Sequence, residues 1–237
     1  MKGASNYLRN QTLKNLLKAI VCILLIMVIA TFLYFRLLTA SVGYFEEAVA
    51  LLALAPLVGF FVYLRKYHVY LAGWEGEKRV IKLLKTSLND DFYLINGLRF
   101  GDGQGDVDHV ILGSSGVFAL ETKNWSGRIS CDGDNWERDG KRHASGSTPS
   151  EQSKRNARRV KHAIEASGDA PFHGWVEPVV VFTNDHARLQ LINTTVPVLK
   201  IKQLPSYIIA HKNHNNSRPY SREEIERIAD AVLKQSK

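Results

Sequence analysis

The feature that most limits the fold is a stretch of 17 residues without a charged side chain, from Ala19 to Phe35. As a helix it would rise about 26 Å, close to the hydrocarbon thickness of a bilayer. A second uncharged stretch of 17 residues, interrupted by Pro56 and Gly59, runs from Ala48 to Leu64. We therefore expect two transmembrane helices, at about residues 16–35 and 48–64, that form a hairpin. A buried core helix, or for the first stretch a cleavable signal peptide, would give the same pattern.

Most of the positive charge lies beside these two stretches. Residues 1–66 contain seven Lys or Arg residues and two Glu residues, a net charge of +5 out of +8 for the chain. Basic residues mark the cytoplasmic ends of membrane helices, and here they lie before the first stretch and after the second: Lys2, Arg9, Lys14, Lys18, Arg65 and Lys66. Only Arg36, with Glu46 and Glu47, lies between them. We expect a multi-pass protein of the inner or cell membrane with both termini in the cytoplasm.

The remaining residues read as an α/β domain. Helical spacing of apolar residues is found over 72–88 and 150–166, and Ser221 with Glu224 forms a capping box that starts a last helix. Short apolar or alternating runs predict strands at 92–98, 106–112, 117–123, 127–131, 135–138, 176–182 and 196–201. This order of elements predicts a mixed sheet with helices on both faces. The single cysteine of this part, Cys131, excludes an internal disulfide.

Charged side chains gather on the predicted hairpin of residues 106–123. Side chains two apart on a strand share a face, so Asp106 lies with Asp108, and Glu121 lies with Lys123. Several carboxylates and one ammonium at one sheet edge are costly to bury unless a cation or a phosphate compensates them. Oxygen ligands favour Mg²⁺ or Mn²⁺ over zinc. The alternative is a surface ion pair between Glu121 and Lys123.

Four blocks of sequence resemble the NERD, or nuclease-related, domain of the PD-(D/E)XK, restriction-endonuclease-like superfamily. The blocks are Trp74-Glu-Gly-Glu77, Gly105-Asp-Val-Asp-His-Val110, the segment Gly116 to Gly127 (GVFALETKNWSG), and Pro178-Val-Val-Val-Phe-Thr-Asn184. The resemblance covers roughly residues 72–185. It implies a restriction-endonuclease-like mixed sheet flanked by helices, and a metal-dependent nuclease.

The resemblance also assigns roles to individual residues. Glu77 matches the acidic residue of the first helix, Asp108 the Asp of the PD element, and Glu121 with Lys123 the (D/E)XK element. Asp108, Glu121 and Asp106 would then ligate Mg²⁺ or Mn²⁺. Gln152 matches a Gln that some branches carry on the following helix. No proline precedes Asp108, and for Glu77 a solvated helix residue is the alternative.

The helix from residue 150 is strongly basic. Lys154, Arg158 and Lys161 share one face by their spacing, and Gln152 and Asn156 lie four residues apart. Such a stripe is typical of binding to a phosphate backbone, so we take these five residues as nucleic-acid contacts. A solvated helix, or one that faces anionic lipid, is the alternative.

Three large side chains are expected to lie outside the site. His109 should point to the face opposite Asp108, as a core histidine. Trp125 and Trp136 are expected to cap the sheet, with stacking on bases as the alternative.

Together these features predict three regions: a membrane hairpin at 1–66, a nuclease-like domain at 72–185, and a strand and helix extension at 186–237 that packs on the domain. The expected function is a membrane-anchored, divalent-metal-dependent nuclease that acts on DNA, in preference to RNA, at the cytoplasmic face. The alternative is a non-catalytic nucleic-acid-binding or protein-interaction module on the membrane.

Overall fold

The computed structural model describes residues 6–39, 43–101, 103–168, 172, 174–211 and 219–236, without the side chain of Glu46. Lys2, one of the predicted flanking charges, lies outside the described residues. The chain divides into two compact units, Asn6–Trp74 and the residues from Glu75 onward. Each unit is described by itself.

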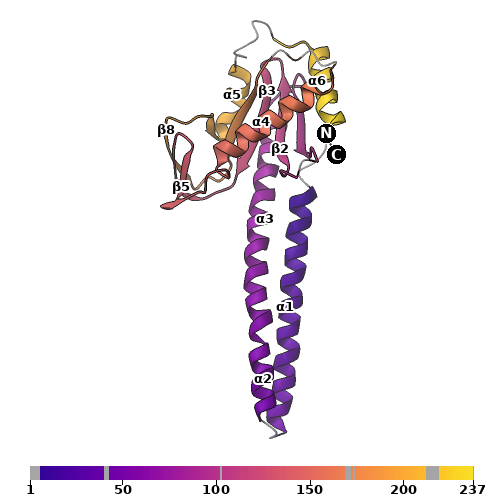
Figure 1. Cartoon of the computed structure of the whole chain (residues 1–237), viewed down its shortest axis with the longest axis vertical. Helices are drawn as coiled ribbons and strands as arrows, with labels where there is room; N and C mark the ends of the chain where they lie inside the picture. Colours follow the sequence, from indigo (N-terminus) through magenta and orange to yellow (C-terminus); the bar gives the residue numbers. More distant parts are fainter. Residues whose placement is uncertain are drawn as a thin grey trace. The chain divides into compact units, whose positions relative to one another are not determined.

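The first unit is a helical hairpin (Figure 1) of α1 (Asn6–Leu38), α2 (Tyr44–Leu52) and the first part of α3 (Leu54–Ser87). The more buried positions of α1 follow 3–4 spacing, at Leu8, Thr12, Asn15, Ala19, Cys22, Ile26, Ile29 and Leu33. The opposing positions of α3 are largely aromatic: Phe60, Tyr63, Tyr67, Tyr70 and Trp74. The two helices therefore meet along one seam of regularly spaced side chains, as in a coiled coil.

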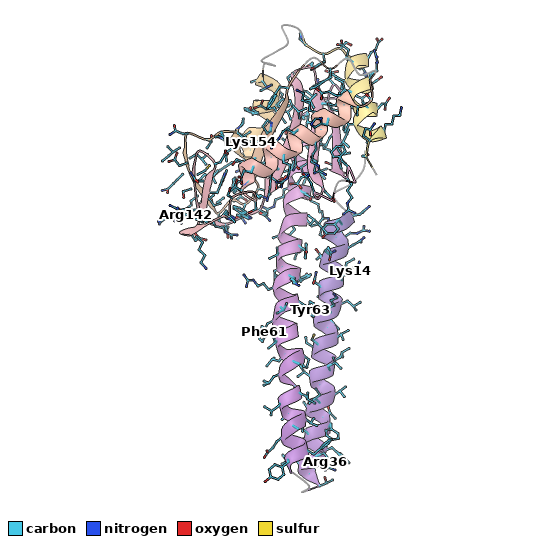
Figure 2. All side chains as sticks on the ribbon, in the orientation of Figure 1. Lys14, Arg36, Phe61, Tyr63, Arg142 and Lys154 are labelled. Carbon is cyan, nitrogen blue, oxygen red and sulfur yellow. The ribbon has the colours of Figure 1, made fainter. Side chains whose placement is uncertain are left out.

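The two helices pack closely along this seam, and many side chains outside it are large and apolar. Gly59 of α3 lies against Cys22 of α1, where an added Cβ would be 3.2 Å from the sulfur. Large apolar side chains such as Val28, Phe35 and Phe61 are 61–67% exposed, and Figure 2 shows Phe61 pointing away from the neighbouring helix. The segments Asn6–Leu38 and Glu47–Ser87 are both long and apolar enough to cross a membrane. These segments contain the two predicted spans.

The second predicted span differs from the structure in one respect. Instead of one continuous helix, α2 ends at Leu52 and α3 begins at Leu54. Pro56 lies in the first turn of α3, where its missing N–H costs no helical hydrogen bond. The helix predicted at 72–88 is not separate either, because α3 continues unbroken from Leu54 to Ser87.

The second unit contains a five-stranded mixed sheet in the order β1-β2-β3-β7-β9. Strands β1 (Tyr93–Leu98), β2 (Val107–Gly113) and β3 (Gly116–Lys123) are antiparallel, whereas β7 (Val176–Phe182) and β9 (Val198–Lys200) continue parallel to β3. Helices α4 (Pro149–Glu165) and α6 (Arg222–Lys234) cover one face (Figure 1). The C-terminal part of α3 and α5 (Leu204–Ala210) cover the other. The predicted mixed sheet with helices on both faces is confirmed.

A second, four-stranded sheet extends from the ends of β3 and β7. Its order is β6-β5-β4-β8, with β4 (Gly127–Asp132), β5 (Asn135–Arg138), β6 (Lys141–Arg142) and β8 (Ala187–Ile192). The parallel neighbours β3 and β7 are followed in the chain by the parallel neighbours β4 and β8. The second sheet therefore begins at the edge where β3 ends in Lys123.

Capping confirms two predicted helix starts. At α4 the Thr148 side chain accepts a hydrogen bond from Glu151 N, and the Glu151 carboxylate accepts one from the Thr148 N–H. Ser221 and Glu224 form the same reciprocal pair before α6. The strands β6 and β8 and the helix α5 were not predicted from the sequence.

Candidate active site at the end of strand β3

The last residues of β3 carry the first two functional side chains. Strand alternation directs Phe118 and Leu120 into the core under α3 and α5, and it directs Glu121 and Lys123 to the α4 side. Glu121 is 7% exposed. One of its carboxylate oxygens accepts a hydrogen bond from Lys123 Nζ at 2.5 Å, and the other accepts one from Asn156 Nδ2 of α4 at 2.9 Å. The ion pair between Glu121 and Lys123 is therefore enclosed and does not lie on the surface.

Asp108 lies on the neighbouring strand β2 and is attached to β3 through the backbone. Its Oδ2 atom accepts a hydrogen bond from the Thr122 N–H at 2.7 Å. Within the described part of the chain, its Oδ1 atom has no hydrogen-bond partner. Burial, followed by the carboxylates of Glu121 and Glu77, raises the pKa of Asp108 well above its ordinary value. Repulsion between close carboxylates therefore adds to the effect of burial.

Glu77 reaches this group from α3 on the other side of the strand ends. Its side chain is 4% exposed, so the solvated alternative for this residue is wrong. The preceding residue explains the close approach of the helix. A Cβ at Gly76 would lie 3.0 Å from Thr183 Oγ1 and 3.1 Å from Asn124 Cβ, so a larger residue there would require these neighbours or α3 to shift.

Lys123 is held from two sides. Besides Glu121, its Nζ atom donates to Gln152 Oε1 of α4 at 2.7 Å, and Gln152 Nε2 donates to the Ser147 carbonyl at 2.8 Å. Burial alone would lower the pKa of Lys123, but the carboxylates of Glu121 and Asp108 outweigh burial and raise it. The group is therefore a fixed ammonium that points into the carboxylate cluster.

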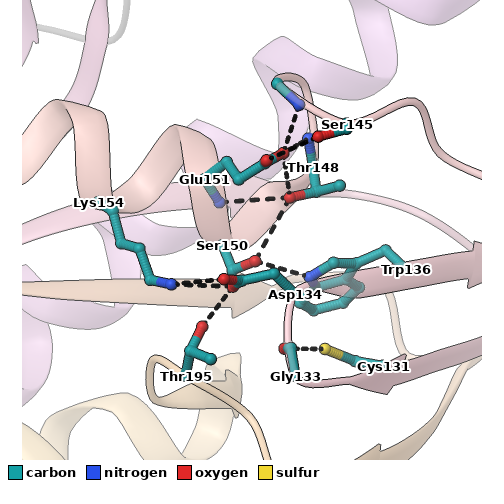
Figure 3. Close-up of polar contacts among 11 residues, drawn as sticks. Cys131, Gly133, Asp134, Trp136, Ser145, Thr148, Ser150, Glu151, Lys154 and Thr195 are labelled. Carbon is teal, nitrogen blue, oxygen red and sulfur yellow. Dashed lines mark hydrogen bonds and ion pairs between the residues drawn. The ribbon is translucent and has the colours of Figure 1, made fainter.

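The five residues predicted to contact nucleic acid divide between two flanks of α4. Gln152 and Asn156 face the site, where they hold Lys123 and Glu121. Lys154 lies on the other flank and donates to both oxygens of Asp134 at 2.9 and 2.7 Å, beside Thr195 (Figure 3). Lys161 pairs with Glu165, and Arg158 is exposed.

Asp106 does not join Asp108 on a strand. It precedes β2, which begins at Val107, and its Oδ1 atom accepts a hydrogen bond from Arg99 Nε at 2.7 Å. The side chain is 19% exposed. Its negative charge is thus already compensated by a guanidinium.

Sequence reasoning missed one residue at this site, Arg159. Its Nη1 atom donates to Asn156 Oδ1 at 3.3 Å and its Nη2 atom donates to the Gly105 carbonyl at 2.9 Å. The guanidinium thereby fixes the loop before β2 and orients the amide that holds Glu121. The spacing of Gln152, Asn156 and Arg159 at i, i+4 and i+7 is the signal that could have identified it.

The histidine and tryptophan assignments are confirmed. His109 is fully buried, with its Nδ1 atom 2.7 Å from Asn96 Oδ1, and burial lowers its pKa to about 3. Trp136 is 1% exposed and donates to Ser150 Oγ at 3.0 Å (Figure 3). Trp125 stacks on His143 with ring centres 4.5 Å apart. Both indoles thus belong to the packing around the second sheet.

The donor set at the end of β3 fits a hard divalent cation. Among the described residues, no group of three or more His, Cys, Asp or Glu side chains is placed to hold a metal ion. Asp108 and Glu121 supply two carboxylates, which is the number through which Mg²⁺ is commonly bound while it keeps several waters. The free Oδ1 atom of Asp108 is a ready ligand, and a cation would relieve the repulsion that, together with the larger effect of burial, raises the pKa of Asp108.

Residues 72–183 match the family model of the nuclease-related domain. An uncharacterized protein of Bacillus anthracis is 29% identical over 82 residues, which cover 33% of this chain and 39% of that protein. No solved structure matches the chain.

Proposed function

We propose that the protein is a membrane-anchored, divalent-metal-dependent nuclease that hydrolyses phosphodiester bonds at the cytoplasmic face, because residues 72–183 match the family model of the nuclease-related domain. DNA is the preferred substrate of this proposal and RNA the second. The observation that carries it is the enclosed cluster of Asp108, Glu121 and Lys123, joined by Glu77 and braced by Gln152 and Asn156. A purely structural ion pair would need neither the additional buried carboxylates nor the amide supports.

The side chains divide the work between binding and charge stabilisation. Asp108 and Glu121 would hold Mg²⁺ or Mn²⁺, and Asn156 fixes one oxygen of Glu121 for that purpose. The chemistry that such an ion supplies when bound is activation of water and neutralisation of negative charge on the phosphate. Lys123, held as an ammonium by Gln152, donates hydrogen bonds to oxygens on which negative charge develops as the phosphodiester bond breaks. Glu77 adds negative potential that favours a cation beside Asp108.

We propose that the helical hairpin anchors this domain in a bilayer. Each helix buries only one seam, and the remaining apolar surface has no protein partner among the described residues of the hairpin. Exposed apolar surface of this extent is stable in lipid rather than in water.

The proposed activity predicts metal-dependent cleavage by the full-length protein in a neutral detergent. With Mg²⁺ or Mn²⁺ it should cut labelled single- or double-stranded DNA or RNA, and EDTA should stop the reaction. The cleavage products of each of the four substrates, single- and double-stranded DNA and RNA, are separated on denaturing gels. Binding without cleavage of any of them, at any concentration of either ion, would identify the non-catalytic module.

The basic flanks of the hairpin predict its orientation. An alkaline-phosphatase reporter fused to the C-terminus in a bacterial host should show no periplasmic activity, because Lys14, Lys18, Arg65 and Lys66 resist translocation. A fusion after Thr39, between α1 and α2, is the matched control and should be active. Activity of the C-terminal fusion together with inactivity of the control would mean that the hairpin has the opposite orientation, and the proposed cytoplasmic location of the domain would be wrong.

A further inference from the structure

A hollow of about 590 Å³ lies at the beginning of the second sheet, outside the cluster of carboxylates. Its lining comes from the start of β4, the turn between β5 and β6, and the start of β8: Gly127, Arg128, Asp139, Gly140, His186 and Arg188. Two guanidinium groups and one imidazole thus surround the same space. None of these residues is used by the proposed chemistry.

The two arginines are placed together by strand register. Arg128 of β4 lies directly opposite Arg188 of the parallel strand β8, so both side chains project from the same face of the sheet. Like charges directly opposite each other destabilise a sheet. In the described part of the chain, neither guanidinium has a hydrogen-bond or ion-pair partner, and both residues are exposed. A bound anion would relieve this repulsion.

The floor of the hollow is fixed by its backbone. Gly127 has a φ of +94°, and a Cβ there would lie 2.5 Å from the carboxylate oxygens of Asp139. This close approach lets Asp139 Oδ1 accept the Arg128 N–H at 2.8 Å. The other oxygen of Asp139 lies 3.9 Å from Arg138 Nε, so a third guanidinium offsets the one acidic group of the lining.

The hollow lies near the site along the chain. Strand β3 ends at Lys123 beside Phe182 of β7, and Gly127 then begins β4 beside Ala187 of β8. Lys123 and Arg128 are five positions apart in the chain, so their Cα atoms are at most about 17 Å apart even with extended backbone. A nucleic-acid strand carries one phosphate per about 3.4 Å of helix axis. A phosphate in the hollow would therefore lie within about five nucleotides of one at Lys123.

We propose that Arg128 and Arg188 form a subsite that binds a backbone phosphate of the nucleic-acid substrate, separate from the phosphate that is cleaved. Guanidinium forks match the geometry of phosphate oxygens and hold them through paired hydrogen bonds. The identity of the ligand rests on the proposed nuclease function. The subsite would position the strand for Lys123 without taking part in bond cleavage.

The test measures binding in the absence of cleavage. The full-length protein in a neutral, non-ionic detergent is titrated with a fluorescein-labelled 20-base-pair DNA duplex in EDTA, and its affinity is determined from 50 to 200 mM salt. The double variant Arg128→Gln with Arg188→Gln should lower the salt slope by about 1.8, because each lost phosphate contact removes about 0.9. Its affinity near 100 mM salt should fall on the order of 10- to 100-fold. The control, Arg222→Gln with Arg227→Gln, removes the same charge from exposed positions of α6 and should leave the slope unchanged.

The outcomes separate this subsite from the activity. A reduced slope in a protein that cleaves nothing would retain the subsite and reject the nuclease. Cleavage by the wild type with an unchanged slope in the double variant would retain the nuclease and reject the subsite. If the double variant instead loses only its affinity for a short-chain phosphatidylglycerol, the hollow binds lipid headgroups and the proposal is overturned.

Discussion

Replacing Lys123 by alanine is expected to slow phosphodiester cleavage by about 100-fold or more, while the protein still binds Mn²⁺. The ammonium interacts electrostatically with the carboxylates of both Glu121 and Asp108. Removing one preorganised donor from an enclosed site typically costs 10² to 10³ in rate. The carboxylates remain in Lys123→Ala, and with less positive charge beside them they should hold a cation at least as tightly. Calorimetric titration with Mn²⁺ and single-turnover cleavage measure the two effects on the same preparation.

Two further variants show whether the loss comes from the ammonium itself. Gln152→Ala removes a hydrogen-bond acceptor that holds Lys123 Nζ but leaves the charge, so a smaller loss of rate is expected. Lys82→Ala removes an exposed lysine of α3 and should change neither quantity. Equal activity in all of these proteins would identify a contaminating nuclease. Loss of Mn²⁺ binding in Lys123→Ala would mean that the variant has lost the folded site.

The alternation of side chains along strands made the centre of the site predictable. On β3 the period of two is set by covalent geometry, so the apolar run before Glu121 indicates a buried strand whose polar end must also be enclosed. The same rule correctly separates His109 from Asp108. It fails for Asp106 because β2 begins one residue later, at Val107, and the side chain pairs with Arg99. Strand ends are where the periodicity no longer constrains the backbone.

The basic helix shows how a charge pattern can be grouped too broadly. Residues two apart on a helix differ by about 200° in direction, so Lys154 and Asn156 cannot share a flank. The helical spacing itself separates the amides that hold Glu121 and Lys123 from the basic stripe. The acidic partner of Lys154 could not be predicted, because Asp134 comes from the turn between β4 and β5.

The sequence of β8 contains an alternating pattern that could have predicted this strand. In Ala187–Ile192 the inward positions Ala187 and Leu189 alternate with Arg188 and Gln190, which is the pattern of a half-buried strand. Its pairing with β4 could not be read from the sequence, because 54 residues or more separate the two strands along the chain. The phosphate subsite depends on that pairing.

We expect Asp108→Asn to be more stable than the wild type without metal and less stable than the wild type with saturating Mn²⁺. In the metal-free protein, burial and the carboxylates of Glu121 and Glu77 raise the pKa of Asp108, so the folded state binds the proton more tightly than the unfolded state. Stability from this group is therefore present at low pH and is lost as pH rises from the unfolded pKa, about 3.9, through the raised folded value. Asparagine keeps an acceptor for the Thr122 N–H without the charge, so the variant should be the more stable protein at pH 7 and should lose that advantage below pH 4.

Saturating Mn²⁺ should invert this order at pH 7. A ligand at 100 times its Kd stabilises the folded state by about 2.7 kcal/mol, and only the wild type retains both carboxylates that hold the ion. Metal affinity in Asp108→Asn should fall at least 10- to 100-fold, the range that follows even from loss of residues that merely support a ligand. Thermal unfolding at pH 4 and pH 7, with and without Mn²⁺, measures both effects. Asp106→Asn is the matched control, and because Arg99 already compensates Asp106, its effect on Mn²⁺ affinity should be the smaller one. Unchanged Mn²⁺ affinity in Asp108→Asn would remove the metal site from the end of β3.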